Sequence, residues 1–281
     1  MHVNFPVVFH AFGLNLPAHL VFETIAYGVG FRLYLWLRKK NHDTISDETR
    51  LTVLVGAVVG AAVTSKVLGF AEHPELWPLA ARNPAYLLAA KTILGGLLGG
   101  IIGVETVKAF AGVKRSTGDI YVFPLLLAIM IGRIGCLLTG VSDGTWGKPT
   151  TFFTGFDAGD GVIRHPTPLY EIMFLGVLAI ALLILRKWTS PERDLSRSGK
   201  GDFPPELMRG GLAALEPLKE GDLFKLFIMA YCGWRFCIEF LKPVATYGPG
   251  LSILQMAALA GVAYYAAWFV RRTLGEHYDR A

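Results

Sequence analysis

The sequence predicts an all-α, polytopic membrane protein with seven transmembrane helices, an N-terminus outside the membrane and a cytoplasmic C-terminus. Three observations predict this class. Of the 281 residues, 53% are hydrophobic and only 17% are charged, whereas soluble domains carry about 25% charged residues. Apolar runs long enough to cross a bilayer recur along the chain. The basic residues between these runs gather in alternate loops.

The apolar runs predict the helices directly. A helix needs about 20 residues to cross a ~30 Å hydrocarbon core at 1.5 Å per residue, and seven runs are close to this length. They span residues 18–37, 51–70, 87–110, 120–139, 169–185, 223–241 and 250–270.

The distribution of Lys and Arg predicts the orientation. Loops after the first, third, fifth and seventh segments hold most of them, whereas the other side holds only Arg82, Lys148, Arg164 and Lys242. Cytoplasmic loops carry the positive excess, so the N-terminus is expected outside. The net charge of +5 is explained by the excess of Lys and Arg in loops that face the anionic cytoplasmic leaflet. It therefore indicates no nucleic-acid partner.

The chain is expected to form one transmembrane domain over residues 18–272. Residues 1–17 have no basic segment and no small-residue cleavage site, and so predict an interfacial arm rather than a signal peptide. Outer loop 140–168 is rich in glycine and aromatic residues, which fits either a lid or a connector with interfacial anchors. Cytoplasmic loop 188–222 and cytoplasmic tail 273–281 complete the prediction.

Ionisable residues gather in the predicted outer halves of six segments. A charge within a bilayer is costly and marks a functional site or a paired partner. The pattern therefore predicts a polar cavity that opens to the outer leaflet. The segment residues are Glu23, Lys66, Lys91, Arg133, Glu171, Arg235 and Glu239, and the adjoining loop residues are Asp143, Arg164 and His165.

Two arginines at similar depth suggest an anion site. Arg235 and Glu239 are four residues apart in "GWRFCIEF", hence on one helical face, where the carboxylate can orient the guanidinium. Arg133 lies at the same predicted depth on another segment. Two guanidinium groups can bind a phosphodiester in a bidentate manner. A structural ion pair that joins helices is the alternative for Arg235 and Glu239.

The remaining signals are weaker. Glycines in "KTILGGLLGGIIGVE" have the spacing for close helix approach, and a smooth wall that admits an acyl chain is the alternative or additional role. His165, at the predicted water boundary, is either a base or a hydrogen-bonding residue. Cys136, Cys232 and Cys237 lie in apolar segments without metal spacing, so they predict packing residues, and no metal motif is present.

The motifs "RHPTPLYE", "GRIGCLLTGVSDGTWG", "GWRFCIEFLKP", "AYGVGFRLYLWL" and "GGIIGV" resemble, in order and spacing, those of the bacterial prolipoprotein diacylglyceryl transferases. The resemblance implies a multi-pass protein of the bacterial cytoplasmic (inner) membrane with its site facing the outer leaflet. It also implies transfer of the diacylglyceryl group of phosphatidylglycerol to the lipobox cysteine thiol of a prolipoprotein, with release of glycerol phosphate and no cofactor.

Matching residue by residue, the resemblance assigns catalytic and substrate-binding roles. The two arginines match a phosphate-binding pair, and His165 is the expected base. The catalytic set is Arg133, Arg235, His165, Glu239, Tyr27 and Asp143, and the substrate-binding set is Arg133, Arg235, Gly99, Gly100, Gly147, Tyr170 and Glu171.

The chain also departs from the family pattern. The histidine of the family's glycine run is replaced by Leu98, or by Leu94 if the runs are aligned differently. Cys136 stands at the signature asparagine and Pro168 at a glutamine, and most of the head region between the fourth and fifth helices is missing. The alternatives are therefore a divergent paralogue with another acceptor thiol, or a non-catalytic protein that binds or transports phospholipid.

Overall fold

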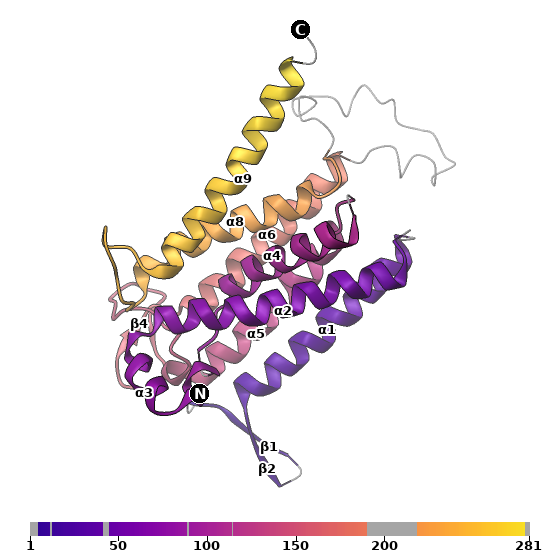
Figure 1. The fold of residues 1–281 in the computed structure, drawn as a ribbon. Coiled ribbons are helices and arrows are strands. Elements are labelled where there is room, and N and C mark those ends of the chain that lie inside the picture. The colour runs from indigo at the N-terminus through magenta and orange to yellow at the C-terminus, as the bar shows by residue number, and fades with distance from the viewer. Residues whose placement is uncertain are drawn as a thin grey trace, which may run out of the picture.

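The computed structural model consists of helices packed side by side in a bundle, with short strands at one end (Figure 1). It describes residues 5–11, 13–41, 45–88, 90–113, 115–189 and 218–278. The α-helices in these ranges are α1 Ala18–Lys40, α2 Asp47–Glu72, α3 Trp77–Arg82, α4 Ile93–Ala111, α5 Val122–Thr139, α6 Thr167–Thr189, α8 Asp222–Ile238 and α9 Ile253–Tyr278. Short 3-10 helices are η1 Pro74–Leu76, η2 Pro84–Leu88, η3 Asp119–Tyr121, η4 Gly140–Asp143 and η6 Glu239–Leu241.

Within the described residues, six stretches are long and apolar enough to cross a membrane, which confirms a mostly helical chain with several such helices. The seventh predicted segment, 223–241, corresponds to α8 and η6. With 17 residues, α8 is shorter than the six, so a seventh crossing stays a prediction, as does the orientation of the termini. The six stretches are Ala18–Lys40, Asp47–Glu72, Ile93–Ala111, Asp119–Asp143, Thr167–Thr189 and Ile253–Leu274.

Two short β-hairpins correct the expectation that the chain is wholly helical. In the predicted arm, β1 Val8–Ala11 pairs antiparallel with β2 Leu14–Pro17, and in the outer loop β3 Phe156–Asp157 pairs with β4 Ile163–Arg164. Strands of two to four residues are too short to show the period-2 alternation that identifies a strand in a sequence. Gly13 has a positive φ of 75°, as hairpin turns often require.

Polar side chains cap the N-terminal ends of α2 and α4. The Ser46 hydroxyl accepts a hydrogen bond of 3.2 Å from the Thr49 amide at the start of α2. The Thr92 hydroxyl accepts one of 3.0 Å from the Gly95 amide at the start of α4. Each bond satisfies a donor that the helix leaves unpaired, so these residues set where the two helices begin.

The glycine run of α4 packs against glycines of α2. A Cβ atom on Gly99 would lie 2.2 Å from the carbonyl oxygen of Gly60, and one on Gly103 would lie 2.0 Å from that of Gly56. Side chains at these positions would push the helices apart. The close-approach role predicted for the run is therefore confirmed, and Gly100, which makes ordinary contacts with α2, lies beside the same interface.

The buried apolar core lies among α4, α5, α6, α8 and α9, whereas α2 presents a long apolar face outward. Exposed Val and Leu side chains along α2 suit contact with lipid. They are Leu51, Val55, Val58, Val59, Val63 and Val67. The core residues are Leu94, Val122, Leu126, Ile129, Leu175, Leu178, Leu182, Leu223, Phe227, Ile228, Tyr231, Cys232, Leu254, Ala258 and Tyr265.

Much of the two predicted cytoplasmic segments, loop 188–222 and tail 273–281, lies outside the described residues. Of loop 188–222, α6 includes the first two residues and the structure resumes at residue 218. Of tail 273–281, α9 continues to Tyr278. The C-terminal end of α9 lies at the end of the bundle away from both hairpins and α3 (Figure 1).

Candidate active site

A buried ionic cluster joins α5, α6 and α8. Arg133 of α5 lies with its Nε 2.9 Å from Oε2 of Glu171 on α6. The other oxygen of this carboxylate accepts a hydrogen bond of 2.7 Å from the Tyr231 hydroxyl on α8. Arg133 and Glu171 are 6% and 2% exposed. One buried carboxylate near the start of α6 therefore links this helix to both α5 and α8.

The second arginine belongs to the same cluster through α8 and η6. Arg235 Nη2 lies 3.0 Å from Glu239 Oε2, as the four-residue spacing predicts. Glu239 also accepts a hydrogen bond of 3.4 Å from the Ser252 hydroxyl just before α9. Tyr231, which bonds to Glu171, is one turn before Arg235 on α8. The pair of Arg235 and Glu239 therefore lies beside the pair of Arg133 and Glu171.

Lys242 shows that the two arginines converge. This lysine, just after η6, is 6% exposed. Burial, followed by repulsion from Arg235, lowers the pKa of Lys242 to about 8. Arg133 adds to this repulsion, and the carboxylates of Glu239 and Glu171 oppose it. A single ammonium group therefore lies within electrostatic reach of both arginines and both of their carboxylate partners.

Some cationic donors of this buried cluster have no partner. Three cations, Arg133, Arg235 and Lys242, lie near three carboxylates, those of Glu171, Glu239 and Glu72 at the end of α2. Within the described part of the chain, Nη1 of Arg235 is buried without a hydrogen-bond partner, and Nε of Arg133 is close to its carboxylate without an aligned hydrogen bond. Such groups are costly to bury unpaired, so the cluster suits an anionic ligand.

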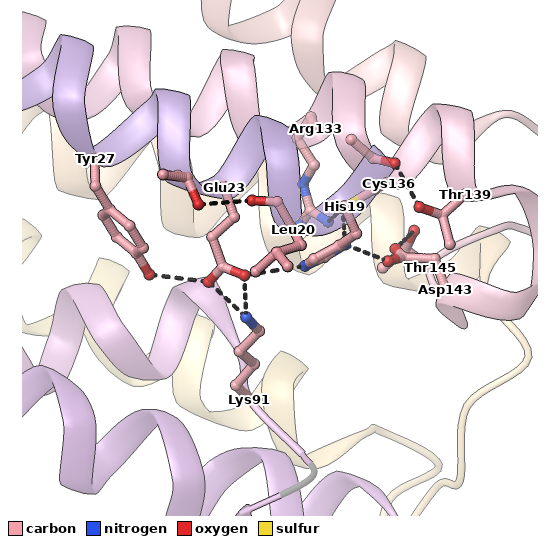
Figure 2. A network of polar contacts seen from close by, with 12 residues as sticks. His19, Leu20, Glu23, Tyr27, Lys91, Arg133, Cys136, Thr139, Asp143 and Thr145 are labelled. Atoms are coloured by element: carbon pink, nitrogen blue, oxygen red, sulfur yellow. Dashed lines mark hydrogen bonds and ion pairs between the residues drawn. The ribbon is translucent and has the colours of Figure 1, made fainter. Parts of the chain in front are cut away.

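A second polar network lies beside Arg133, between α1, α5 and η4 (Figure 2). His19 Nδ1 lies 2.6 Å from Asp143 Oδ1 and 3.9 Å from Cys136 Sγ. Arg133 Nη1 lies 3.6 Å from the same sulfur, so the two clusters touch. His19, Cys136 and Asp143 each offer one donor atom within 4.8 Å of the others, close enough to share a metal ion.

Tyr27 lies at the outer edge of this network. Its hydroxyl donates a hydrogen bond of 3.0 Å to Oε1 of Glu23, one turn earlier on α1, and the side chain is 69% exposed. Glu23 in turn accepts 2.5 and 2.7 Å hydrogen bonds from Lys91 and lies 3.5 Å from His19 Nε2. Among the described residues, Tyr27 is linked to Arg133 through Glu23, His19 and the Cys136 sulfur (Figure 2).

His165 and Tyr170 form a separate group at the start of α6. Nδ1 of His165 lies 3.2 Å from the Tyr170 hydroxyl, which also contacts the Thr154 hydroxyl. Among the described residues, no hydrogen bond or ion pair joins His165 to either arginine. Its role as base thus stays a prediction, which rests on its expected position at the water boundary and on the resemblance.

Gly147 fixes the outer loop against this group. Its amide donates to the His165 carbonyl at 2.9 Å. A Cβ atom there would lie 2.7 Å from Cβ of His165 and 2.9 Å from the Leu241 carbonyl oxygen. Gly147 thus lets the loop pack between the start of α6 and η6, next to Lys242.

The leucines that replace the family histidine lie in or against the apolar core. Leu94 is fully buried in the apolar core, and Leu98 packs against that core. The substrate-binding glycines predicted on the same helix, Gly99 and Gly100, lie at the α2 interface, so an acyl-chain role for them stays a prediction.

Three residues that the sequence did not single out for the site belong to it: His19, Tyr231 and Lys242. His19 is four residues before Glu23, at the start of the first apolar run, and Tyr231 is four residues before Arg235, so each shares a helical face with a charged residue already noted. Lys242 stands out as a lysine on the side poor in basic residues.

The fold and this site together define a helical membrane protein with a buried ionic site built from arginines on separate helices. The family model described as prolipoprotein diacylglyceryl transferase matches residues 6–201. The chain belongs to this family. α8, which carries Arg235, lies beyond the matched range.

Similarity to individual proteins extends over most of the chain. The chain is 29% identical over 245 residues to a phosphatidylglycerol–prolipoprotein diacylglyceryl transferase of Dehalococcoides mccartyi strain 195, covering 84% of this chain and 82% of the relative. It is 26% identical over 276 residues to a protein of the same name from Bordetella parapertussis, covering 89% of this chain and 92% of the relative.

Proposed function

We propose that this chain transfers the diacylglyceryl group of phosphatidylglycerol to the lipobox cysteine of a prolipoprotein and releases glycerol phosphate. The observation that carries the proposal is the meeting of Arg133 and Arg235 around buried Glu171, in a chain of this family. Lys242 adds a third cation, and Nη1 of Arg235, which has no hydrogen-bond partner among the described residues, can donate to the phosphodiester monoanion of this lipid.

The arrangement suits the chemistry of the transfer. As the bond between glyceryl C3 and the phosphate oxygen breaks, negative charge grows on the departing phosphate, and guanidinium groups fixed in advance stabilise it. Glu171 and Glu239 orient the two arginines through their ion pairs. The acceptor must attack as a thiolate, because the thiol is a poor nucleophile.

A shallow, mostly apolar surface hollow suits a lipid substrate. It lies between α1 and α5 and is lined by Ile25, Gly28, Val29, Arg32, Leu33 and Leu127. Leu127 is six residues before Arg133 on α5, which places it about 9 Å deeper along the helix. An acyl chain attached to a headgroup at Arg133 would run in this direction.

The protein's place in the cell follows from the same proposal. We expect seven crossings of the bacterial cytoplasmic membrane, with α8 as the sixth, the N-terminus outside and the site at the outer leaflet. The positive-inside distribution of Lys and Arg supports this orientation. The lipobox segment of a prolipoprotein signal peptide would then approach from the membrane beside the hairpins and outer loop.

A transfer assay tests the proposal. Purified protein in nanodiscs that contain labelled phosphatidylglycerol is incubated with a lipobox peptide, and thioether product and glycerol phosphate are measured. Arg133→Ala and Arg235→Ala should each abolish both products at unchanged protein abundance. Arg164→Ala, which removes an outer-loop arginine paired with Asp160, is the matched control and should leave transfer intact.

The second candidate is a protein that binds or transports phospholipid without chemistry. Two departures from the family pattern favour it: Cys136 stands at the signature asparagine, and the buried Leu94 or the partly buried Leu98 stands at the family histidine. Binding of phosphatidylglycerol that depends on both arginines, without any glycerol phosphate release, would support this candidate. Glycerol phosphate release without peptide modification would instead point to another acceptor.

A further inference from the structure

The ring of His19 is oriented by the carboxylate of Asp143 (Figure 2). Nδ1 of His19 lies 2.6 Å from Oδ1 of Asp143, and the Thr145 hydroxyl donates a hydrogen bond of 2.7 Å to the other oxygen of this carboxylate. The Asp143 side chain is 6% exposed. A bond between Nδ1 and a buried carboxylate fixes the ring and leaves Nε2 as the nitrogen that can contact another molecule.

Nε2 of His19 faces a more exposed part of the network. Oε2 of Glu23 lies 3.5 Å from this nitrogen, which is longer than a good hydrogen bond. Glu23 is bound instead by Lys91, at 2.5 and 2.7 Å, and by the exposed Tyr27. The His19 side chain is 31% exposed and that of Lys91 is 47% exposed. A molecule that approaches along α1 can therefore reach Nε2, which makes no hydrogen bond within the described part of the chain.

The same imidazole lies close to the arginine proposed to bind phosphate. Sγ of Cys136 is 3.9 Å from Nδ1 of His19 and 3.6 Å from Nη1 of Arg133, so these two nitrogens are no more than about 7.5 Å apart. Reacting atoms in a productive complex lie about 3–3.5 Å apart. An acceptor sulfur at His19 and a lipid phosphate at Arg133 can therefore both lie within reach of one glyceryl carbon.

The charges around the ring favour the imidazolium form of His19. Asp143 contacts Nδ1 and Glu23 lies near Nε2, and two carboxylates stabilise a cation that lies between them. An imidazolium beside a thiol favours the thiolate, which is the nucleophile, whereas a free cysteine with a pKa of about 8.5 is mostly protonated at neutral pH. The charged and titratable groups that surround His19 are Asp143 from η4, Cys136 and Arg133 from α5, Glu23 from α1, and Lys91 from the segment before α4.

We propose that the His19 imidazolium, positioned by Asp143, binds the acceptor cysteine as a thiolate on the exposed side of the ring. This inference rests on the proposed function. The acceptor thiol loses its proton to water, and the Nε2–H of His19 donates to the resulting thiolate. The sulfur electron pair forms an S–C bond to glyceryl C3, the C–O bond to phosphate breaks, and its electron pair leaves with glycerol phosphate, whose charge Arg133 and Arg235 hold.

The pH dependence of transfer to a lipobox peptide tests the role of His19. At saturating phosphatidylglycerol, the wild-type rate should reach half of its maximum at least about one unit below pH 8.5, because the imidazolium lowers the pKa of the acceptor thiol. His19→Gln should move this midpoint up to about pH 8.5, the value for a free cysteine. The variant should therefore be slower than the wild type by about tenfold or more near pH 6.5, and the two rates should approach each other above about pH 8.5.

Two further variants separate this role from general damage to the protein. Asp143→Asn removes the positioning carboxylate and should move the midpoint in the same direction as His19→Gln. His10→Gln removes an exposed histidine of the N-terminal hairpin, which bonds to Asn15, and should keep the wild-type midpoint. A midpoint that is unchanged in His19→Gln, or a loss of rate in that variant that is equal at every pH, would overturn the proposal.

A cross-linking measurement keeps the inference falsifiable if a variant folds poorly. Full-length wild-type protein in nanodiscs is irradiated with a lipobox peptide that carries benzoylphenylalanine in place of its cysteine, and the modified residues are mapped by mass spectrometry. The peptide should attach to α1 near Glu23 or to Lys91, and an excess of unlabelled peptide should prevent this. No attachment, or attachment only at the start of α6 beside His165, would overturn the position of the acceptor.

The two measurements separate this inference from the proposed function. Transfer with the same midpoint in wild type and His19→Gln would overturn the role of His19 and leave the proposed function standing. Attachment of the peptide to α1 in a protein that never releases glycerol phosphate would support the acceptor position and overturn the proposed function. Transfer with a midpoint that moves up in His19→Gln supports both.

Discussion

Arg133→Lys tests whether the guanidinium geometry, and not charge alone, binds the phosphate. Nε of Arg133 is 2.9 Å from Glu171 and Nη1 is 3.6 Å from Cys136 Sγ, so this side chain presents its donors in two directions. A lysine ammonium is a point charge without a planar fork. It can pair with Glu171 or bind phosphate well, but it cannot do both through separate nitrogens.

The expected loss is one charge-assisted hydrogen bond in the transition state. Such a bond contributes about 1.5–3 kcal/mol, and 1.36 kcal/mol corresponds to tenfold in rate. kcat/KM for phosphatidylglycerol should therefore fall by about 10- to 150-fold. Initial rates of glycerol phosphate release at several lipid fractions measure it. A value within twofold of the wild type would show that positive charge suffices and would refute the bidentate argument.

Three other substitutions probe the cluster and its scaffold. Glu171→Gln should lower the free energy of unfolding by about 3–5 kcal/mol, because it leaves a buried cation unpaired; denaturation by sodium dodecyl sulfate in mixed micelles measures this. Since burial lowers the pKa of Lys242 to about 8, Lys242 loses its charge above that pH. KM for phosphatidylglycerol should then rise above about pH 8 in the wild type, and Lys242→Met should remove this rise. Gly103→Val places a Cβ atom 2.0 Å from the Gly56 carbonyl oxygen and should destabilise the bundle by about 1–3 kcal/mol or more, whereas Gly96→Val, with open space, should not.

Matched controls exist for the two charge substitutions. Asp160→Asn breaks the exposed pair with Arg164 and should leave unfolding unchanged, because exposed pairs contribute little. Lys148→Met removes an exposed lysine of the outer loop and should keep the rise in KM. A Glu171→Gln protein as stable as the wild type would contradict the buried pair, and a rise in KM that survives in Lys242→Met would assign the titration to another group.

Local patterns in the sequence predicted the helices and part of the site. Apolar runs near 20 residues long locate the helices because only a helix satisfies its own backbone polar groups in lipid. The Arg235 and Glu239 pair follows from four-residue spacing, since such residues share a helical face. Glycines at small-residue spacing predicted the contact between α4 and α2 that Gly99 makes.

Contacts between distant segments could not be predicted in this way. The pair of Arg133 and Glu171 joins two helices, and its existence depends on how α5 and α6 are rotated about their axes. His19 and Asp143 are 124 positions apart, and their meeting depends on a 3-10 turn that directly follows α5. No periodicity records such a turn, which is why Asp143 was assigned from a resemblance and His19 was missed.

The structure shows the surroundings of the residues at which this chain departs from the family pattern. The family histidine is absent, and the leucines in its place, Leu94 and Leu98, line or adjoin the apolar core. An imidazole that does reach the network of Arg133 is that of His19, which approaches from α1 and contacts Asp143 and the Cys136 sulfur. Two carboxylates flank this imidazole, one at each ring nitrogen. In this chain, therefore, the imidazole that joins the Arg133 network comes from α1 and is positioned by Glu23 and Asp143, and it does not come from the glycine run of α4.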